Sequence, residues 1–331
     1  MKPLQFKVLR LLADGEFHSG ETMANALGKS RASIWLAVRE LDGAGIEVYK
    51  VRGRGYRLAQ SLSLLDQDDI VRQLGADAGA FMLQIMDSVS STNTLAMQCA
   101  ARGGSAIPVI AAEWQEAGRG RMGRAWHAGI GGALTFSLLW RFPQGAAFLA
   151  GLSLAVGVAL MRAFDALGIK EAGLKWPNDA VWRGGKLAGI LIEVQGDMLG
   201  PSTAVIGIGV NVRLSQAVRD RIDQPVSDLE TACARSLDRN RVFALLLRQL
   251  RDALNTFARA GLAPFRDDWH RYHAHQDQMV TLILPDTRLE HGCARGVAED
   301  GALLIETPAG LRRYHSGEIS LRADPHPRLH A

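Results

Sequence analysis

The chain has 331 residues, 47% of them hydrophobic and 22% charged, which is typical of a globular protein and excludes an intrinsically disordered chain. Three widely spaced cysteines exclude a disulfide-rich scaffold, and we expect a reducing, cytoplasmic location. The net charge is only +4, yet residues 1–60 hold ten Lys and Arg against six Asp and Glu, so the whole positive excess lies there. Such an excess favours contact with nucleic-acid phosphates, although a solvated surface would show the same pattern.

Residues 1–62 are predicted to form a winged helix-turn-helix domain. Pro3 can open the first helix, and the hydroxyls of Ser19 and Ser30 can cap the second and the third. A hairpin then turns at residues 52–55, Arg-Gly-Arg-Gly. The expected elements are helices over residues 3–12, from the cap at 19 to about 28, and over 31–42, and strands over 46–51 and 56–58.

The third helix and the hairpin turn carry the candidate DNA contacts. A recognition helix meets base edges with its first residues, and glycines beside the hairpin arginines let the backbone approach a phosphate. The middle of the helix, residues 34–38 (IWLAV), is unusually apolar, and Trp35 could pack in the core, contact DNA or contact another domain. A structural or vestigial domain is therefore the alternative. The candidate contacts are Ser30, Arg31, Ser33, Arg52 and Arg54.

Residues 63–272 alternate strand-like and helix-like segments and are predicted to form a central domain. Residues 147–167 are apolar nearly all round, as expected for a helix packed on a sheet. The most apolar stretch, residues 146–161, is too short to cross a bilayer, and no signal peptide opens the chain, so no membrane partner is expected. Strands are expected over residues 81–86, 109–113, 133–140, 180–182, 189–194 and 204–212, and helices over 68–74, 92–102, 147–167 and 241–260.

The last part of the chain changes character again. Residues 273–323 hold short alternating strands with turns at 285–286, 299–301 and 308–310, which predicts a small β-barrel of SH3-like size. Residues 324–331 are expected to form a disordered tail.

Residues 118–126, GRGRMGRAW, form the most informative loop. They match the pattern G-x-G-x-x-G, but a strand is expected after them, and not the helix that a dinucleotide-binding fingerprint opens. Glycines let a ligand approach the backbone, arginines offer forked donors to carboxylate or phosphate oxygens, and Trp126 offers a face for a base. A basic surface loop or an RNA-binding loop is the alternative, so the loop alone favours phosphate binding only slightly.

A second motif begins at residues 175–179, KWPND, and leads into a predicted hairpin. Pro177 fixes the backbone just before Asn178 and Asp179. Lys186 starts the second strand of the hairpin, where its ammonium group could serve as a point charge for a carboxylate or an α-phosphate. Considered alone, a routine surface lysine is the simpler interpretation.

Together, GRGRMGRAW and KWPNDAVWRGGKLAGILIE closely resemble the biotin–protein ligase family. With the N-terminal winged helix and the C-terminal barrel, the chain resembles the bifunctional form that is also the biotin operon repressor, over about residues 3–322. Further matching segments are Ser91-Thr92-Asn93, residues 113–117 and residues 207–212. The resemblance implies an α+β fold, with a winged helix-turn-helix, a central mixed-sheet catalytic domain related to class II tRNA synthetases, and an SH3-like β-barrel.

The resemblance also implies roles for individual residues. The biotin site would comprise Ser91, Thr92, Asn93, Gln115, Arg119, Gly120, Arg121 and Lys186. The ATP or adenylate site would comprise Arg121, Arg124, Trp126, Asn178, Asp179, Lys186 and Asn211. Among these, Lys186, Arg121 and Arg119 would be catalytic. Simpler roles stay open, since Ser91 or Thr92 could cap a helix, Asp179 could be a turn residue and Asn211 could satisfy strand ends.

The implied activity is the activation of biotin with ATP to biotinyl-5'-AMP, followed by transfer of biotin to a lysine of a biotin carboxyl carrier protein. Mg2+ would arrive with ATP, and the protein alone would hold no metal. The implied partners are operator DNA and, in the adenylate-bound state, a second copy of the chain. The alternatives are a DNA-binding metabolite sensor with an inactive ligase-like domain, which Lys186, Arg119 and Arg121 argue against, and a lipoyl-type ligase, which KWPND and the winged helix argue against.

Two departures from the family pattern and one unassigned cluster remain. The family loop is commonly GRGRRGR, and Met122 replaces one of its arginines here, which bears on phosphate affinity or dimer contacts. The helix over residues 31–42 is less polar than is usual in the family. His273 and His275, near Asp267 and Asp268, could ligate a metal, but their spacing does not match a standard zinc site.

Overall fold

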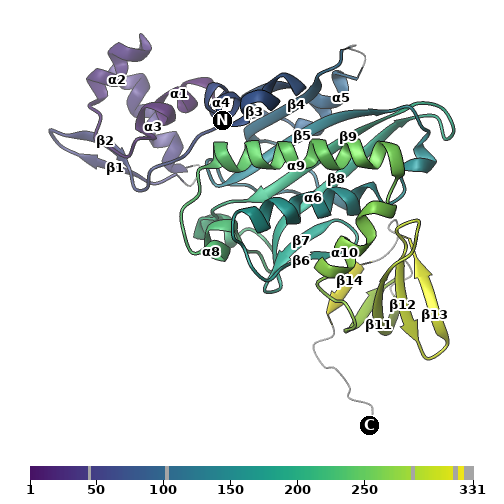
Figure 1. Cartoon of the computed structure of the whole chain (residues 1–331). Coiled ribbons are helices and arrows are strands. Elements are labelled where there is room, and N and C mark those ends of the chain that lie inside the picture. The colour runs from purple at the N-terminus through teal and green to yellow at the C-terminus, as the bar shows by residue number, and fades with distance from the viewer. Residues whose placement is uncertain (44–45, 101–103, 285–287, 316–319, 324–331) are drawn as a thin grey trace.

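The computed structural model describes residues 1–43, 46–100, 104–284, 288–315 and 320–323. The chain forms three successive parts: a helical N-terminal part with a hairpin, a large central sheet covered by helices, and a small C-terminal sheet (Figure 1). None of the described helices is long and apolar enough to cross a membrane. The tail predicted over residues 324–331 lies outside the described residues.

The N-terminal part has the predicted helix-turn-helix and hairpin. Its elements are α1 (Pro3–Leu12), α2 (Gly20–Leu27), α3 (Arg31–Gly43), β1 (Val48–Val51) and β2 (Gly55–Leu58), and the two strands are antiparallel. Ser19 Oγ accepts a hydrogen bond from the Thr22 amide at 2.9 Å, and Ser30 Oγ accepts one from the Ser33 amide at 3.1 Å, so both predicted caps are confirmed. Apolar faces of the three helices enclose a small core of their own.

The central part is built on a seven-stranded sheet of order β3-β4-β5-β9-β8-β7-β6, in which β3 and β4 run parallel and the other neighbours antiparallel. Its strands are β3 (Phe81–Val89), β4 (Ile107–Gln115), β5 (Ala133–Phe142), β6 (Ala172–Lys175), β7 (Asp179–Trp182), β8 (Gly185–Gly196) and β9 (Ser202–Asn211). Its helices are α4 (Gln67–Leu74), η1 (Gly75–Ala80), α5 (Thr92–Gln98), η2 (Arg121–Gly123), η3 (Ala146–Leu149), α6 (Leu152–Ala166), α7 (Gln216–Arg219), α8 (Leu229–Cys233), α9 (Arg239–Ala260), η4 (Ala263–Phe265) and α10 (Arg266–Tyr272).

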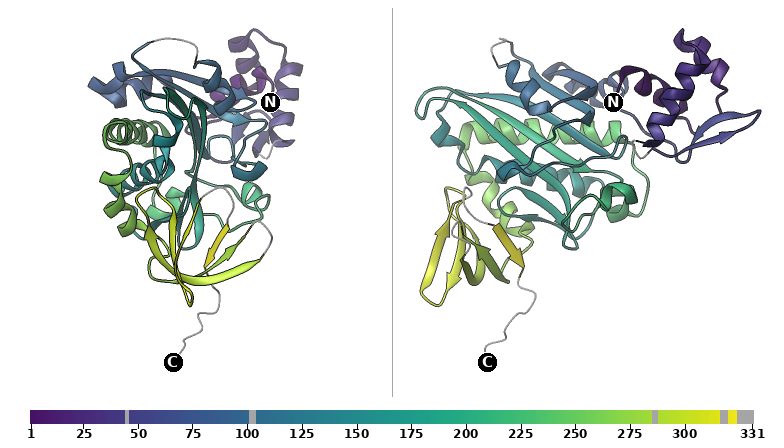
Figure 2. Two further views of the ribbon diagram at one scale, coloured as in Figure 1. Left: turned by 90° about the vertical axis from the view of Figure 1, so that its right-hand side faces the viewer. Right: turned by 180° about the vertical axis from the view of Figure 1, so that it is seen from behind.

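Helices cover the two faces of this sheet unequally. The long helices α6 and α9 pack side by side on one face, where they bury the main core of the protein (Figures 1 and 2). The short helix α5 packs on the other face, against Ile110, Leu139 and Val205, which alternate along their strands with residues of the main core. The face that carries α5 therefore leaves room for a pocket beside that helix.

Two predicted helices are shorter in the structure. The helix predicted over residues 147–167 breaks at Gly151, whose φ of +79° no ordinary helix residue adopts. A Cβ at Gly151 would lie 2.6 Å from Cδ2 of Leu262, so close packing also requires glycine there. The helix predicted over residues 92–102 ends at Gln98, and residues 101–103 lie outside the described part of the chain.

The C-terminal part is a five-stranded antiparallel sheet of order β13-β12-β11-β10-β14. Its strands are β10 (Met279–Ile283), β11 (Leu289–Val297), β12 (Leu303–Thr307), β13 (Gly310–Tyr314) and β14 (Ser320–Ala323). Buried residues such as Val280 and Ile305 continue the main core, and Trp176 Nε1 donates to the Gly301 carbonyl at 3.1 Å. This sheet is thus joined to the central part by apolar and polar contacts.

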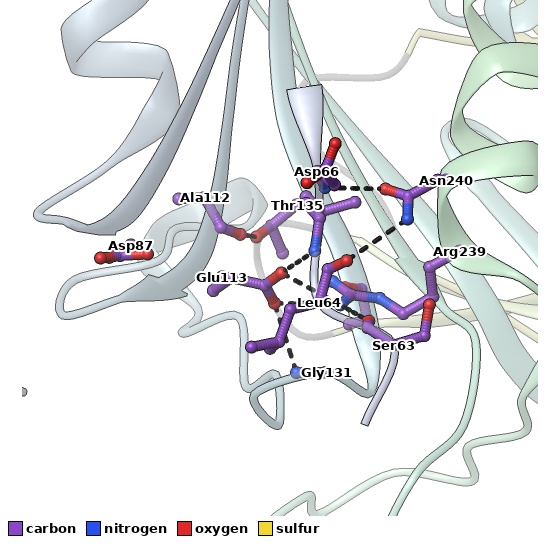
Figure 3. Close-up of polar contacts among 12 residues, drawn as sticks. Ser63, Leu64, Asp66, Asp87, Ala112, Glu113, Gly131, Thr135, Arg239 and Asn240 are labelled. Carbon is purple, nitrogen blue, oxygen red and sulfur yellow. Dashed lines mark hydrogen bonds and ion pairs between the residues drawn. The ribbon is translucent and has the colours of Figure 1, made fainter. Parts of the chain in front are cut away.

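A buried ion pair holds the segment that follows the N-terminal part against the central sheet (Figure 3). Arg239 at the start of α9 lies 3.0 Å from Glu113 on β4, and neither side chain is more than 1% exposed. Glu113 also accepts from the amides of Leu65 and Gly131. Arg239 donates to the carbonyls of Ser63 and Ala133, each at 2.5 Å, and Asn240 binds the Leu64 carbonyl and the Asp66 amide. The segment that follows the winged helix is therefore held by its backbone.

Candidate functional site

A pocket lies on the sheet face that carries α5. It is lined by residues from β4, β5, β8, β9, the start of α5 and the glycine–arginine loop. The structure brings ten of the predicted ligand-binding residues to this one pocket: Ser91, Thr92, Asn93, Gln115, Arg119, Gly120, Arg121, Trp126, Asn178 and Lys186. These residues come from segments that are far apart in the sequence.

The floor of the pocket is a chain of hydrogen bonds between polar side chains. Gln115 Oε1 accepts from the amide of Thr92 at 2.8 Å and lies 3.1 Å from its hydroxyl. Ser137 Oγ lies 2.8 Å from Thr92 Oγ1 and 2.6 Å from Asn93 Oδ1. Because Thr92, Asn93 and Ser137 are buried and the four side chains are already paired with one another, their positions are fixed before a ligand arrives.

Ser91 stands at the N-cap position of α5, but its side chain makes no cap hydrogen bond. The Thr92 amide is instead satisfied by Gln115. Capping therefore does not account for Ser91, whose side chain lines the pocket and is 6% exposed.

The opposite wall of the pocket carries positive charge. Lys186 Nζ lies 2.8 Å from Asp179 Oδ1, and Arg121 donates to Asn178 Oδ1 at 3.3 Å. Asn178 is held in turn, since its Nδ2 donates to the Ile190 carbonyl at 2.7 Å. Burial lowers the pKa of the Arg121 guanidinium, and the negative charge of Asp179 opposes that shift. Two cations from separate elements thus converge where a ligand carboxylate or phosphate could bind.

The loop over residues 118–126 closes on itself like a small hairpin. The Gly120 amide donates to the Arg124 carbonyl at 2.7 Å, and the Trp126 amide donates to the Gly118 carbonyl at 2.9 Å. The loop leads into β5 and not into an α-helix, which agrees with the exclusion of a dinucleotide fingerprint. Met122 lies at the tip, with a left-handed φ of +56° and a side chain that is 69% exposed.

Trp126 packs directly on two glycines of the sheet. A Cβ at Gly209 would lie 2.3 Å from Trp126 Cε2, and one at Gly189 would lie 3.3 Å from Trp126 Cζ3. These glycines therefore accommodate the indole ring. The indole Nε1 is buried and has no hydrogen-bond partner within the described part of the chain.

A second pocket opens on the other side of Trp126 and Lys186. Three further predicted residues meet there or at its border: Arg124 and Asn211 line it, and Asp179 pairs with Lys186. Asn211 is 2% exposed and donates to the carbonyls of Lys186 and Ser227 at 3.0 and 3.2 Å, so one part of its side chain has a structural role. Its Oδ1 has no partner among the described residues.

Sequence reasoning missed three contributors to these pockets. Residues 221–224 and Val226 line the second pocket, and no motif in that segment indicated this. Ser137 has the inward position of a predicted strand and could have been found by alternation along β5. Glu193 follows Gly189 and Leu191 at intervals of two along β8, so the same alternation places it on the pocket face.

The predicted DNA contacts lie at the opposite end of the molecule from the C-terminal sheet (Figure 1). Arg31 is exposed at the start of α3, where Ser30 and Ser33 bind each other at 2.9 Å. Arg52 and Arg54 lie on the turn between β1 and β2, and the Arg54 guanidinium stacks over Phe17 at 4.2 Å. In the middle of α3, Ile34, Ala37 and Val38 are buried, whereas Trp35 is 47% exposed.

His273, which the sequence offered with His275 as a possible metal ligand, has structural contacts within the protein. His273 packs on Trp269 with ring centroids 4.5 Å apart, and its Nδ1 lies 3.2 Å from Gln276 Oε1. Burial lowers the pKa of His273 to about 4. Within the described residues, no group of three or more His, Cys, Asp or Glu side chains is arranged to hold a metal ion.

Three segments of the chain match known families: residues 4–57 an HTH domain, residues 85–211 the biotin/lipoate A/B protein ligase family, and residues 275–322 the biotin protein ligase C terminal domain. The chain is 38% identical to the bifunctional ligase/repressor BirA of Escherichia coli, over 96% of this chain and 97% of that protein. It is 30% identical to BirA of Bacillus subtilis, over 93% and 95%.

A solved structure, the biotin protein ligase from Aquifex aeolicus in complex with biotin and ATP, aligns with a TM-score of 0.61 and 26% identity. The alignment covers 73% of this chain and 99% of that one. Similarity over nearly the whole length to the two BirA proteins, together with the matching domains, shows that this chain belongs to the family of bifunctional biotin–protein ligases and repressors.

Proposed function

We propose that this protein activates biotin with ATP and transfers it to a lysine of a biotin carboxyl carrier protein. One observation carries the proposal: the cations of Lys186 and Arg121 converge beside a polar floor, in which Thr92 and Asn93 are buried and Gln115 is half-buried. The floor suits the cyclic urea of biotin, since its amide and hydroxyl groups offer both donors and acceptors. The cations suit the biotin carboxylate and the α-phosphate of ATP.

The first step joins two anions, so charge neutralisation and alignment supply most of its catalysis. A carboxylate oxygen of biotin forms a bond to the α-phosphorus, and the bond from that phosphorus to the bridging oxygen breaks, which releases pyrophosphate. Lys186 and Arg121 lie on the charged wall where both reactants must meet, and Arg119 approaches from the loop. Together these three residues neutralise the charge that accumulates around the α-phosphate of the transferring adenylyl group.

The second step transfers the biotinyl group to the carrier. The uncharged amine of the carrier lysine attacks the carbonyl carbon of the mixed anhydride, the bond from that carbon to the phosphate oxygen breaks, and AMP leaves while the new amide nitrogen loses a proton. This chemistry needs no covalent nucleophile from the enzyme. The loop over residues 118–126 borders both pockets and would exclude water from the anhydride.

The nucleotide site is proposed around Arg124, Trp126, Asn178, Asp179 and Asn211. The unpartnered Nε1 of Trp126 and Oδ1 of Asn211 are buried polar atoms that a nucleotide could satisfy. Asp179 offers a carboxylate to the Mg2+ that accompanies ATP. A single carboxylate fits a metal that keeps mostly phosphate and water ligands, and the metal would supply further neutralisation of phosphate charge.

We also propose a division of the chain into three domains. We divide it into a DNA-binding domain over residues 1–62, a catalytic domain over 63–272 related to class II tRNA synthetases, and an SH3-like barrel over 273–323. The three cysteines are free thiols, which fits a cytoplasmic enzyme.

A second activity, biotin-dependent repression, is supported by the HTH match over residues 4–57 and by exposed arginines at the start of α3 and on the wing. We propose that the adenylate-bound protein forms a homodimer whose two winged helices bind the half-sites of an operator. Ser30, Arg31, Ser33, Arg52 and Arg54 are the proposed contacts.

The ligase proposal is tested by biotin-dependent exchange of pyrophosphate into ATP, followed by mass measurement of a carrier domain after incubation with the protein, biotin and ATP. Exchange with biotin and an added biotinyl mass are expected. Exchange that requires lipoate in place of biotin would show a lipoyl ligase, and no exchange with either acid would show an inactive sensor domain.

A further inference from the structure

Glu193 is a carboxylate at the pocket that the proposed steps do not use. Its Oε2 accepts a hydrogen bond from Asn93 Nδ2 at 2.7 Å, and its Oε1 lies 3.2 Å from a guanidinium nitrogen of Arg119. Asn93 belongs to the buried floor, whereas Arg119 belongs to the loop. One side chain on β8 therefore contacts both the part of the pocket that would hold the urea ring and the part that would close over it.

The contact with Asn93 fixes the orientation of its carboxamide. An ionised carboxylate accepts hydrogen bonds and donates none, so the NH2 of Asn93 must face Glu193 and its oxygen must face Ser137. Asn93 is 4% exposed and Ser137 is completely buried, so neither side chain can turn to water. The carboxamide also lies against Gly207, where a Cβ would be 2.2 Å from Asn93 Oδ1.

That orientation sets the direction of the remaining hydrogen bonds in the floor. Ser137 has one hydroxyl proton and two neighbours, Asn93 Oδ1 at 2.6 Å and Thr92 Oγ1 at 2.8 Å. While Asn93 presents its oxygen, Ser137 donates its one proton to Asn93. The Thr92 hydroxyl then donates to Gln115 or to Ser137, and its acceptor sites stay open to a ligand. If the carboxamide turned over, Ser137 would accept from Asn93 and donate to Thr92, so one of the two acceptor sites of the Thr92 hydroxyl would be occupied.

We propose that Glu193 is a positioning residue that fixes the order of donors and acceptors in the pocket floor and thereby its preference for a cyclic urea. The inference rests on the proposed function, because it takes this pocket as the biotin site. A cyclic urea combines two N–H donors with one carbonyl acceptor. A floor whose donors and acceptors have fixed positions rejects a ligand with a different arrangement of donors and acceptors, because buried polar groups would then be left unpaired.

The test is calorimetric binding of biotin and of 2-iminobiotin, in which an imino group replaces the urea oxygen, to the full-length protein. Glu193→Gln keeps the size of the side chain but can both donate and accept, so it no longer dictates the orientation of Asn93. We expect biotin binding to weaken about tenfold, 2-iminobiotin binding to change less, and the preference for biotin to fall accordingly. The KM for biotin should rise while kcat and the KM for ATP change less than about threefold.

Two further variants make the result specific. Glu193→Asp keeps a group that only accepts, so it should retain the preference for biotin even where both ligands bind more weakly. Glu171→Gln removes an exposed carboxylate of the same domain, paired with Arg183 on the surface, and should change neither affinity. Unchanged biotin binding in Glu193→Gln, or an equal loss for both ligands, would overturn the inference. Absence of biotin binding to the unmodified protein would instead overturn the proposed function.

Discussion

The ammonium nitrogen of Lys186 lies 2.8 Å from Oδ1 of Asp179, and both side chains are about four-fifths buried at the border of the two pockets. The two charges neutralise each other, so a lysine can be kept in a sheltered site without a ligand. An arriving carboxylate or phosphate then competes with Asp179 for the same ammonium group. In the folded protein, Asp179 thus neutralises the charge for which we propose a catalytic role.

We predict that Lys186→Ala lowers biotin-dependent pyrophosphate exchange at least about a hundredfold, because it removes a cation at the reacting phosphate and leaves Asp179 as an unpaired anion facing two anionic substrates. Lys170→Ala, which removes an exposed lysine of the same domain, is the control and should retain full exchange. Normal exchange in Lys186→Ala would contradict the proposed role.

The buried pair of Arg239 and Glu113 supports a second prediction, on stability. Arg239→Ala leaves Glu113 as an uncompensated buried charge and removes the donors to the carbonyls of Ser63 and Ala133, so the free energy of unfolding should fall by about 3–5 kcal/mol. Urea denaturation measures the loss. Arg259→Ala on the exposed end of the same helix should cost less than about 0.5 kcal/mol. Equal costs for the two variants would show that the buried pair contributes nothing.

Local features were the most predictable from sequence. The hydroxyls of Ser19 and Ser30 cap their helices as expected, because a cap depends on only three or four neighbouring residues. The glycine–arginine loop and the KWPND segment were recognisable because charged residue types are concentrated in them. The structure adds that Lys186 and Arg121 face one pocket.

Features decided by distant parts of the chain were not predictable. The helix break at Gly151 depends on contact with Leu262, which follows far along the sequence. Glu113 and Arg239 each resemble ordinary surface residues until the fold brings them together. The same holds for residues 221–226, which reach the second pocket because the backbone of Lys186 pairs with Pro225 and Ser227. Gly209 likewise makes room for Trp126, which lies far from it along the sequence.

A third prediction concerns stability at acidic pH. His273 has a pKa of about 4 in the folded protein because it is buried, against about 6.5 when unfolded, so the unfolded state binds the proton more readily. The stability that the neutral imidazole of His273 contributes to the folded protein is therefore fully present above pH 6.5. This stability is lost as the pH falls towards 4. Between pH 7 and pH 5 the free energy of unfolding should fall by about 2 kcal/mol from this residue. In His273→Gln that part of the decrease should disappear, and an unchanged pH profile would show that another group is responsible.

The exposed face of α3 supports the last prediction, which depends on the proposed binding of operator DNA. Arg31, Trp35 and Arg39 follow one another at intervals of four, so they form a stripe along one side of the helix, and the Arg39 guanidinium lies 5.2 Å from the centre of the Trp35 ring. An apolar ring between two cations suits the major groove, where the methyl group of thymine is the apolar feature of the bases.

We therefore expect Trp35 to contact a thymine methyl group. The probe is a DNA duplex that the unmodified protein, in the presence of biotin and ATP, selects from a random-sequence pool. Each thymine of this duplex is then replaced in turn by uracil, which lacks only the methyl group. One replacement should weaken binding by about 1 kcal/mol, and in Trp35→Ala the same replacement should have no effect. Leu36→Ala, which also removes an exposed apolar side chain of α3, is the control and should stay sensitive to uracil at that position. If Trp35→Ala responds to every uracil as the unmodified protein does, Trp35 takes no part in base recognition.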